Sequence, residues 1–282
     1  MRNGKDFILM SLKTIELFAG IGGFSVGLER TGAFKTIGFC EIDEQCHKVL
    51  RKNWPDVPIY TDVTQLKATD LPEIPDVITG GFPCQDISIA GKGEGLDGKR
   101  SGLWWEFHRL IRECNPRWVI IENVAMLRRR GLGQVLRSLA EIGYDAEWHC
   151  ISARAVGAPH QRDRLWILAY PNSQRQLQSE RSKQDIRRWV SNSSMELADS
   201  YSQRLQGHGQ KLGRPSQICT QETLAMFSNS NGKAQWETEP KVGRLVDGIP
   251  RRSHRLRQLG NAVVPQIPEY LGQCIRDQQK GN

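Results

Sequence analysis

A cysteine in a stiff, glycine-rich setting is the first candidate for chemistry. Cys84 belongs to the segment GGFPCQ, residues 80–85, which directly follows the apolar segment Asp76–Thr79. Loops at the carboxyl ends of parallel strands are where α/β sheets bind ligands, and Pro83 stiffens the approach to the thiol by fixing φ. A cysteine held on such a loop is a candidate nucleophile if its thiolate is stabilised. Because a lone cysteine is more often structural, the surrounding pattern must decide.

Two further segments put charged side chains at strand ends. Glu122 follows the apolar segment Trp118–Ile121, so its carboxyl is expected in the same cleft as Cys84. Arg162 and Arg164 precede the apolar segment Leu165–Ala169, where arginines can face a phosphate or a base oxygen. The alternatives are a helix-capping carboxylate and two solvated arginines.

The segment FAGIGG, residues 18–23, follows the first predicted strand. Its glycines allow a tight turn and a close approach of the backbone to a ligand at a helix N-terminus. Glu41 ends the second predicted strand about twenty residues later, where an acidic residue can accept hydrogen bonds from ribose hydroxyls. Together they indicate an adenosine-containing cofactor. A dinucleotide fits poorly because GxGxxG is not in register, and an ordinary glycine turn with a capping acid is the alternative.

These residues need a scaffold of alternating strands and helices. Apolar runs predict strands over Thr14–Phe18, Thr36–Cys40, Asp76–Thr79, Trp118–Ile121 and Leu165–Ala169. Helical patterns are predicted over Gly22–Arg30, Asp43–Trp54, Gly102–Glu113, Leu132–Ile142 and Gln266–Arg276. This alternation predicts an α/β fold with a parallel sheet and helices on both faces.

Composition narrows the class of protein. The chain has 282 residues, 38% hydrophobic and 25% charged, which is typical of a globular protein with one large domain or two. Its apolar runs are too short to span a bilayer, and the N-terminus lacks a signal-peptide pattern. Seven scattered cysteines form no CxxC pair, so we expect reduced thiols, a cytoplasmic protein and no metal site.

The positive charge is concentrated late in the chain. Residues 171–257 carry 15 Lys and Arg against 8 Asp and Glu, whereas residues 1–170 carry 22 against 21. A polar, basic segment with weak periodicity indicates a small irregular domain that contacts a polyanion, with nucleic acid as the first candidate. A merely soluble basic surface is the alternative.

Taken in order, FAGIGG, GGFPCQ, ENV, QRDR and GNAVVP resemble the motifs of the DNA (cytosine-5) methyltransferases, of bacterial and phage type. The resemblance covers most of residues 13–170 and 258–276. It implies an α/β, Rossmann-like mixed sheet of the S-adenosylmethionine-dependent methyltransferases, with helices on both faces. Residues 1–170 and 258–282 would form the catalytic domain, with the final helix returning beside the first strand. Residues 171–257 would form a small irregular target-recognition domain.

The resemblance also implies the reaction and its catalytic residues. The methyl group of S-adenosylmethionine would pass to carbon 5 of a cytosine flipped out of a specific double-stranded DNA sequence. Cys84 would add to carbon 6, Glu122 would hydrogen-bond ring nitrogen 3 and the exocyclic amine, and Arg164 would lie near the cytosine oxygen.

Binding residues follow from the same resemblance. The expected cofactor residues are Phe18, Ala19, Gly20, Ile21, Gly22, Gly23, Glu41, Ile42, Asp62, Val63, Phe82, Asn261 and Ala262. Gln85, Ser88 and Arg162 are expected to contact DNA, and the glycine-rich Ile89–Ser101 to close over it. A bacterial or phage-infected cell is the expected setting, with a cognate restriction endonuclease as a partner or with none.

Three other interpretations stay open. An RNA cytosine-5 methyltransferase would keep the fold and change the substrate, although the basic insert favours DNA. A non-catalytic DNA-binding relative is disfavoured because Cys84, Glu122 and Arg164 are all present. A nicotinamide oxidoreductase would leave Cys84, Glu122 and Gly260–Pro265 without roles.

Overall fold

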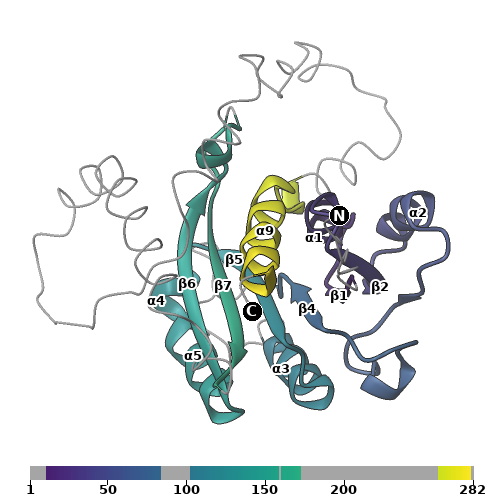
Figure 1. Cartoon of the computed structure of the whole chain (residues 1–282), viewed down its shortest axis with the longest axis horizontal. Helices are drawn as coiled ribbons and strands as arrows, with labels where there is room; N and C mark the ends of the chain where they lie inside the picture. The colour runs from purple at the N-terminus through teal and green to yellow at the C-terminus, as the bar shows by residue number, and fades with distance from the viewer. Residues whose placement is uncertain (1–10, 84–101, 159, 173–259, 281–282) are drawn as a thin grey trace, which may run out of the picture.

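The computed structural model describes residues 11–83, 102–158, 160–172 and 260–280 (Figure 1). Within them a seven-stranded sheet has the order β3-β2-β1-β4-β5-β7-β6. Its strands are β1 Leu12–Leu17, β2 Phe34–Cys40, β3 Ile59–Tyr60, β4 Val77–Gly80, β5 Trp118–Val124, β6 Tyr144–Ser152 and β7 Asp163–Pro171.

The sheet is mixed, not wholly parallel. Strands β3, β2, β1, β4 and β5 pair in parallel, whereas β7 pairs antiparallel with both β5 and β6. The parallel direction predicted for Leu165–Ala169 from strand–helix alternation is therefore wrong. Only a short connection separates β6 from β7, and it contains the 3-10 turn η3 (Ala153–Val156), so the chain reverses direction without a crossover helix. The mixed sheet implied by the resemblance is confirmed.

All five predicted helices are present, with small differences at their ends. The helices are α1 Gly23–Arg30, α2 Glu44–Asn53, α3 Leu103–Cys114, α4 Leu127–Arg130, α5 Leu132–Glu141 and α9 Gln266–Lys280. The short helix α4 and the 3-10 turn η1 (Ala68–Asp70) were not predicted.

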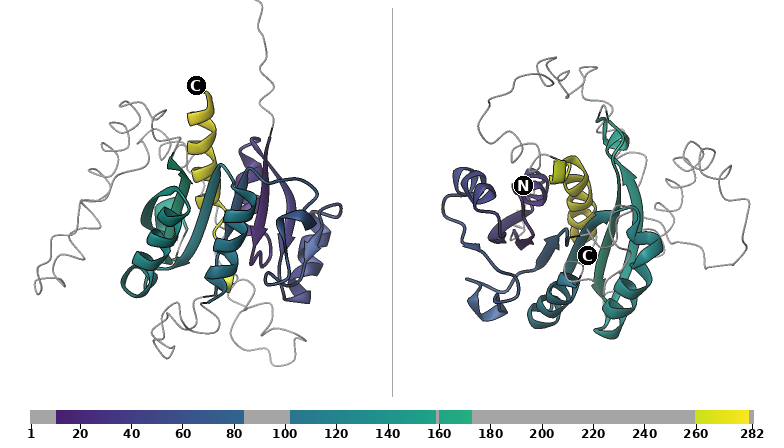
Figure 2. Two further views of the ribbon diagram at one scale, coloured as in Figure 1. Left: turned by 90° about the horizontal axis from the view of Figure 1, so that it is seen from below. Right: turned by 180° about the vertical axis from the view of Figure 1, so that it is seen from behind.

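Each face of the sheet has its own apolar core. Val119 and Ile121 of β5 face the side covered by α3 and α5, whereas Trp118 and Ile120 face the side covered by α1 and α9 (Figures 1 and 2). Successive side chains of a strand point to opposite faces. The central strands are thus apolar on both sides, which is why they read as continuous apolar runs.

The last helix packs against the first. A Cβ on Gly27 of α1 would lie 2.2 Å from the Pro265 carbonyl oxygen, and one on Gly272 of α9 would lie 3.0 Å from Leu28. Glycine therefore lets the two helices approach closely. The resemblance placed the final helix beside the first strand, and the structure places it against α1, the helix that follows this strand.

No helix in the described part of the chain is long and apolar enough to cross a membrane. Several predictions lie outside the described residues: those for Cys84, Gln85, Ser88, the loop Ile89–Ser101 and almost all of the insert 171–257.

Candidate active site

The strand register brings the predicted residues to one edge of the sheet. Leu17 at the end of β1 pairs with Gly80 at the end of β4, and Gly80 pairs with Ile121 of β5. Val124 at the end of β5 pairs with Arg164 near the start of β7. The glycine turn after β1, the segment that leads to Cys84, and the pair Glu122 and Arg164 therefore share this edge.

Glu122 and Arg164 form an ion pair across β5 and β7. Arg164 Nε lies 2.9 Å from Glu122 Oε1, and the two side chains are 24% and 13% exposed. Burial raises the pKa of the Glu122 carboxyl, and the charges of Arg164 and Arg162 offset only part of that rise. A Cβ on Gly81 would lie 2.9 Å from Glu122 Oε2. Glycine at 81 thus leaves room for a carboxyl that can hold a proton.

Asn123 fixes the backbone that leads to Cys84. Its side-chain amide donates to the Phe82 carbonyl at 3.1 Å, and its Oδ1 accepts from the Val124 N–H at 2.8 Å. The Phe82 ring is buried against Trp104, with ring centroids 5.4 Å apart. The chain is therefore held from both sides two residues before Cys84.

The segment after β1 makes the predicted tight turn. Gly20 and Gly22 have φ of 54° and 85°, and Phe18 has φ of 53°, which is unusual for a bulky residue. Such strain is a feature of functional sites. The Gly20 N–H donates to Glu41 Oε2 at 2.7 Å, and the Asp43 N–H donates to Glu41 Oε1 at 2.8 Å. Glu41 thereby joins the turn to the end of β2.

Three more of the predicted cofactor residues follow the ends of β2 and β3, and they differ in polarity and exposure. Ile42 is 81% exposed directly after β2. Asp62, exposed after β3, accepts from the Thr64 hydroxyl and N–H at 2.8 and 2.9 Å, and these bonds lower the pKa of its carboxyl. Val63 is buried. An exposed apolar side chain and a charged acceptor suit the face and the edge of a purine.

Arg162 reaches back to the C-terminal segment. Its guanidinium donates to the Gly260 carbonyl and, at 3.2 Å, to the Ala262 carbonyl. Asn261, between these carbonyls, is exposed. Arg162 therefore ties β7 to the turn before α9, and its contact with DNA stays a prediction.

Sequence reasoning missed two groups at this edge. Glu16 of β1 is fully buried and accepts from the Phe24 N–H at 3.2 Å, and from the Ser25 N–H and hydroxyl at 2.9 and 2.6 Å. Burial raises its pKa to about 7. The sequence did contain a signal for Glu16, because an acidic residue inside an apolar strand, just before a predicted helix, can accept from the N–H groups at the start of that helix. The exposed arginines 128–130 of α4, directly after β5, were visible as a charge run.

The chain is similar to cytosine-specific DNA methylases and to Type II methyltransferases. Residues 12–244 match the family model "C-5 cytosine-specific DNA methylase". The Type II methyltransferase M.CviJI of Paramecium bursaria Chlorella virus IL3A is 42% identical over 161 residues, which cover 57% of this chain and 43% of that protein. The Type II methyltransferase M2.BsuMI of Bacillus subtilis (strain 168) is 39% identical over 166 residues, covering 56% and 42%. The chain thus spans less than half the length of these relatives.

Among solved structures, a putative DNA modification methyltransferase encoded within an Escherichia coli prophage has 27% sequence identity and a TM-score of 0.49. The match covers 58% of this chain and 48% of that one.

Proposed function

Because the chain belongs to the C-5 cytosine-specific DNA methylase family, we propose that it transfers a methyl group to carbon 5 of cytosine in double-stranded DNA. The observation that carries the proposal is the buried Glu122 carboxyl, with its raised pKa, paired to Arg164 at the edge where the chain enters Cys84. A carboxyl of this kind can give a proton to the ring and take it back. Cytosine must leave the duplex to reach such a buried group.

The residues at this edge fit S-adenosylmethionine as the methyl donor. Glu41 is held by two backbone N–H groups beside the ends of β1 and β2, where it would accept from ribose hydroxyls. A Cβ on Gly20 would meet no atom within 4 Å, so the turn is open on that side. Ile42 would pack on the adenine face and Asp62 would accept from its amino group. When bound, the cofactor supplies an electrophilic methyl group to carbon 5.

The remaining cofactor assignments are proposals of the same kind. The segment Phe18–Gly23 would lie along the methionine end, and Val63 and Phe82 would back the pocket from the core, where both are buried. Asn261 and Ala262, tied to β7 through Arg162, would close it.

Cytosine needs activation because carbon 5 is a weak nucleophile. The Cys84 thiolate forms a bond to carbon 6, and the ring electrons move towards nitrogen 3, where Glu122 gives a proton. The resulting enamine is nucleophilic at carbon 5, which would take the methyl group as the bond from that group to the cofactor sulfur breaks and S-adenosylhomocysteine leaves. Glu122 would take the proton back from nitrogen 3. A base then removes the carbon-5 proton, the double bond re-forms, and the bond from sulfur to carbon 6 breaks to return the thiolate. Arg164 orients the Glu122 carboxyl through their ion pair. Arg164 would also lie near the cytosine oxygen and help to orient the ring.

Residues 1–170 and 258–282 are proposed as the catalytic domain and residues 171–257 as the domain that reads the DNA sequence. The excess of Lys and Arg in the insert supports this division, because such side chains neutralise phosphates. Gln85 and Ser88 would contact DNA beside the emptied position.

Trapping tests the covalent step. Random-sequence duplex DNA is made with 5-fluorocytosine at part of its cytosine positions. After methyl transfer, carbon 5 carries fluorine in place of the proton that a base would remove. The ring double bond therefore cannot re-form, and the bond from sulfur to carbon 6 persists. We expect a protein–DNA product that resists denaturant, requires S-adenosylmethionine and is absent for Cys84→Ser. A product of equal yield from Cys84→Ser would contradict the assigned nucleophile.

A further inference from the structure

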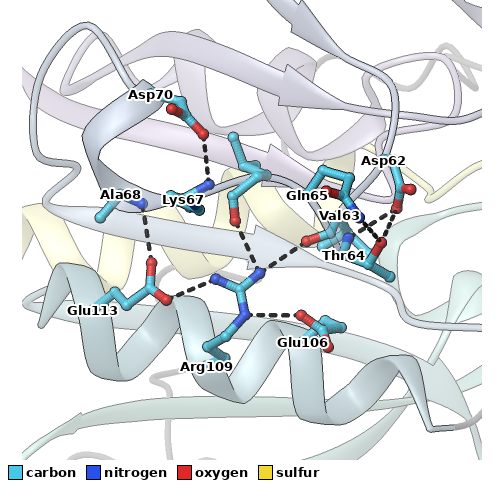
Figure 3. Close-up of polar contacts among 11 residues, drawn as sticks. Asp62, Val63, Thr64, Gln65, Lys67, Ala68, Asp70, Glu106, Arg109 and Glu113 are labelled. Atoms are coloured by element: carbon cyan, nitrogen blue, oxygen red, sulfur yellow. Dashed lines mark hydrogen bonds and ion pairs between the residues drawn. The ribbon is translucent and has the colours of Figure 1, made fainter.

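Arg109 lies on α3 and faces the segment that follows β3 (Figure 3). Its Nε donates to Glu106 Oε2 at 2.8 Å, and its Nη1 donates to Glu113 Oε1 at 2.7 Å. Both carboxylates lie on the same helix, three and four residues away. These two pairs hold the guanidinium plane in one orientation.

The third nitrogen of Arg109 bonds to backbone outside its own helix. Nη2 donates to the Val63 carbonyl at 3.0 Å and to the Leu66 carbonyl at 2.8 Å. The side chains of Val63 and Leu66 are 6% and 3% exposed and pack in the core beneath α3. Arg109 thus satisfies two carbonyls of a segment whose side chains are already anchored.

Glu113 holds the same segment further along. Its Oε2 accepts from the Ala68 N–H at 3.0 Å while its Oε1 pairs with Arg109. At the near end, Asp62 carries the carboxylate that is ordered by Thr64. The segment 62–68 is therefore fixed to α3 at three backbone points, and Asp62 adjoins the first of them.

We propose that Arg109 is a positioning residue for the cofactor: by holding the Val63 and Leu66 carbonyls, it places the Asp62 carboxylate that accepts from the adenine amino group. The inference rests on the proposed function. Ion pairs as exposed as these add little stability by themselves, so the carbonyl contacts carry the effect. Lysine cannot replace the arginine, because a single ammonium lacks the planar fork that reaches two carboxylates and two carbonyls together.

The test measures how well the protein distinguishes two ligands. S-Adenosylhomocysteine carries the 6-amino group that Asp62 would recognise, whereas S-inosylhomocysteine carries an oxygen there. Dissociation constants for both are measured by calorimetry on the full chain for the wild type, Asp62→Ala, Arg109→Lys and Arg109→Ala. Arg112→Ala is the matched control, because Arg112 is an exposed arginine on the same helix.

The wild type and Arg112→Ala should prefer S-adenosylhomocysteine by about tenfold or more, the size expected for a hydrogen bond to a charged acceptor. Asp62→Ala should lose this preference, and the Arg109 variants should lose most of it. A general loss of packing would weaken both ligands equally and leave the ratio unchanged. Circular dichroism shows whether each variant folds. If Arg109→Ala does not fold, Arg109→Lys, which keeps the positive charge, provides the test of the ligand preference.

Two outcomes separate the inference from the function it rests on. If Arg109→Lys keeps the wild-type ratio, or if Asp62→Ala does so, the positioning role is wrong while the methyltransferase assignment stands. If the wild type binds neither S-adenosylhomocysteine nor S-adenosylmethionine, the proposed function itself fails.

Discussion

Glu122 Oε1 and Arg164 Nε lie 2.9 Å apart, on two neighbouring strands that run in opposite directions. An arginine at that distance would ordinarily lower the pKa of a carboxyl, yet burial of Glu122 outweighs the attraction and the pKa is raised. The pair therefore combines orientation by Arg164 with a carboxyl that can keep its proton. This combination suits the transfer of a proton to a bound ring.

Replacing the carboxyl should remove catalysis without removing binding. Glu122→Gln keeps the shape of the side chain but cannot transfer a proton. We expect kcat for methyl transfer to fall by roughly 10²–10⁴-fold, with the affinity for S-adenosylmethionine within about twofold of the wild type. Steady-state kinetics and calorimetry measure the two quantities.

Glu147→Gln is the control for that substitution. Glu147 on β6 is also a carboxyl whose pKa is raised by burial, and it accepts from the Tyr170 hydroxyl at 2.9 Å. It lies on an edge strand outside the proposed machinery, so its variant should keep the wild-type kcat. Equal losses in both variants would mean that the effect of Glu122→Gln is structural.

The backbone before Cys84 should depend on Asn123. Asn123→Ala frees the Phe82 carbonyl, and the nucleophile would then be held less precisely for attack on carbon 6. We expect about a tenfold fall in kcat, since misplacement of a reacting group costs rate. The affinity for S-adenosylhomocysteine should change little. An unaltered single-turnover rate would show that the amide does not position the thiol.

Glu16 should make the stability of the fold depend on pH. Burial raises its pKa from 4.5 to about 7, so between those values the folded protein keeps a proton that the unfolded chain releases. The free energy of unfolding should therefore fall as pH rises through this window, by about 3 kcal/mol from this group. The contribution of Glu16 should be constant above pH 7.

Urea unfolding between pH 5 and pH 8 measures this dependence. Glu16→Gln holds a neutral side chain at every pH, so its free energy of unfolding should decline less steeply than that of the wild type. Parallel curves for the two proteins would rule out Glu16 as the source of the decline.

The insert should determine which DNA sequence is methylated. Exchanging residues 171–257 for the corresponding segment of a family member should transfer that protein's sequence preference, because the catalytic edge lies wholly outside the exchanged residues. The measurement is a comparison of the DNA sequences that are methylated by the original protein and by the chimera. An unchanged preference in an active chimera would assign recognition to the catalytic domain.

Much of the scaffold was predictable because the central strands are apolar on both faces. Ile78, Val119 and Ile120 belong to short continuous apolar runs, which are typical of strands that are buried on both faces. β6 was missed because its edge position leaves polar residues such as Glu147 and His149 within the strand, so no apolar run marks it. The direction of β7 was missed because alternation of strands and helices carries no information about a hairpin-like return.

The sequence motifs named residues that lie close together in the structure, but they did not predict the contacts between these residues. The motifs named Glu41, Glu122 and Arg164, and the strand register explains why the structure gathers them at one edge. The contacts of Asn123, which belongs to the ENV motif, and of Arg109 could not be predicted, because each side chain donates to a backbone carbonyl more than forty residues away in sequence. Such contacts follow from packing between elements, which local pattern does not encode.

Direct detection of methyl transfer tests whether the protein methylates cytosine in DNA through Cys84. The full chain and Cys84→Ser are incubated with tritiated-methyl S-adenosylmethionine and mixed unmethylated genomic DNA, and 5-methylcytosine is mapped by bisulfite sequencing. We expect label in DNA at one recurring sequence for the wild type and none for Cys84→Ser. Binding of S-adenosylmethionine by the wild type with no label in DNA, or label only in RNA, would contradict it.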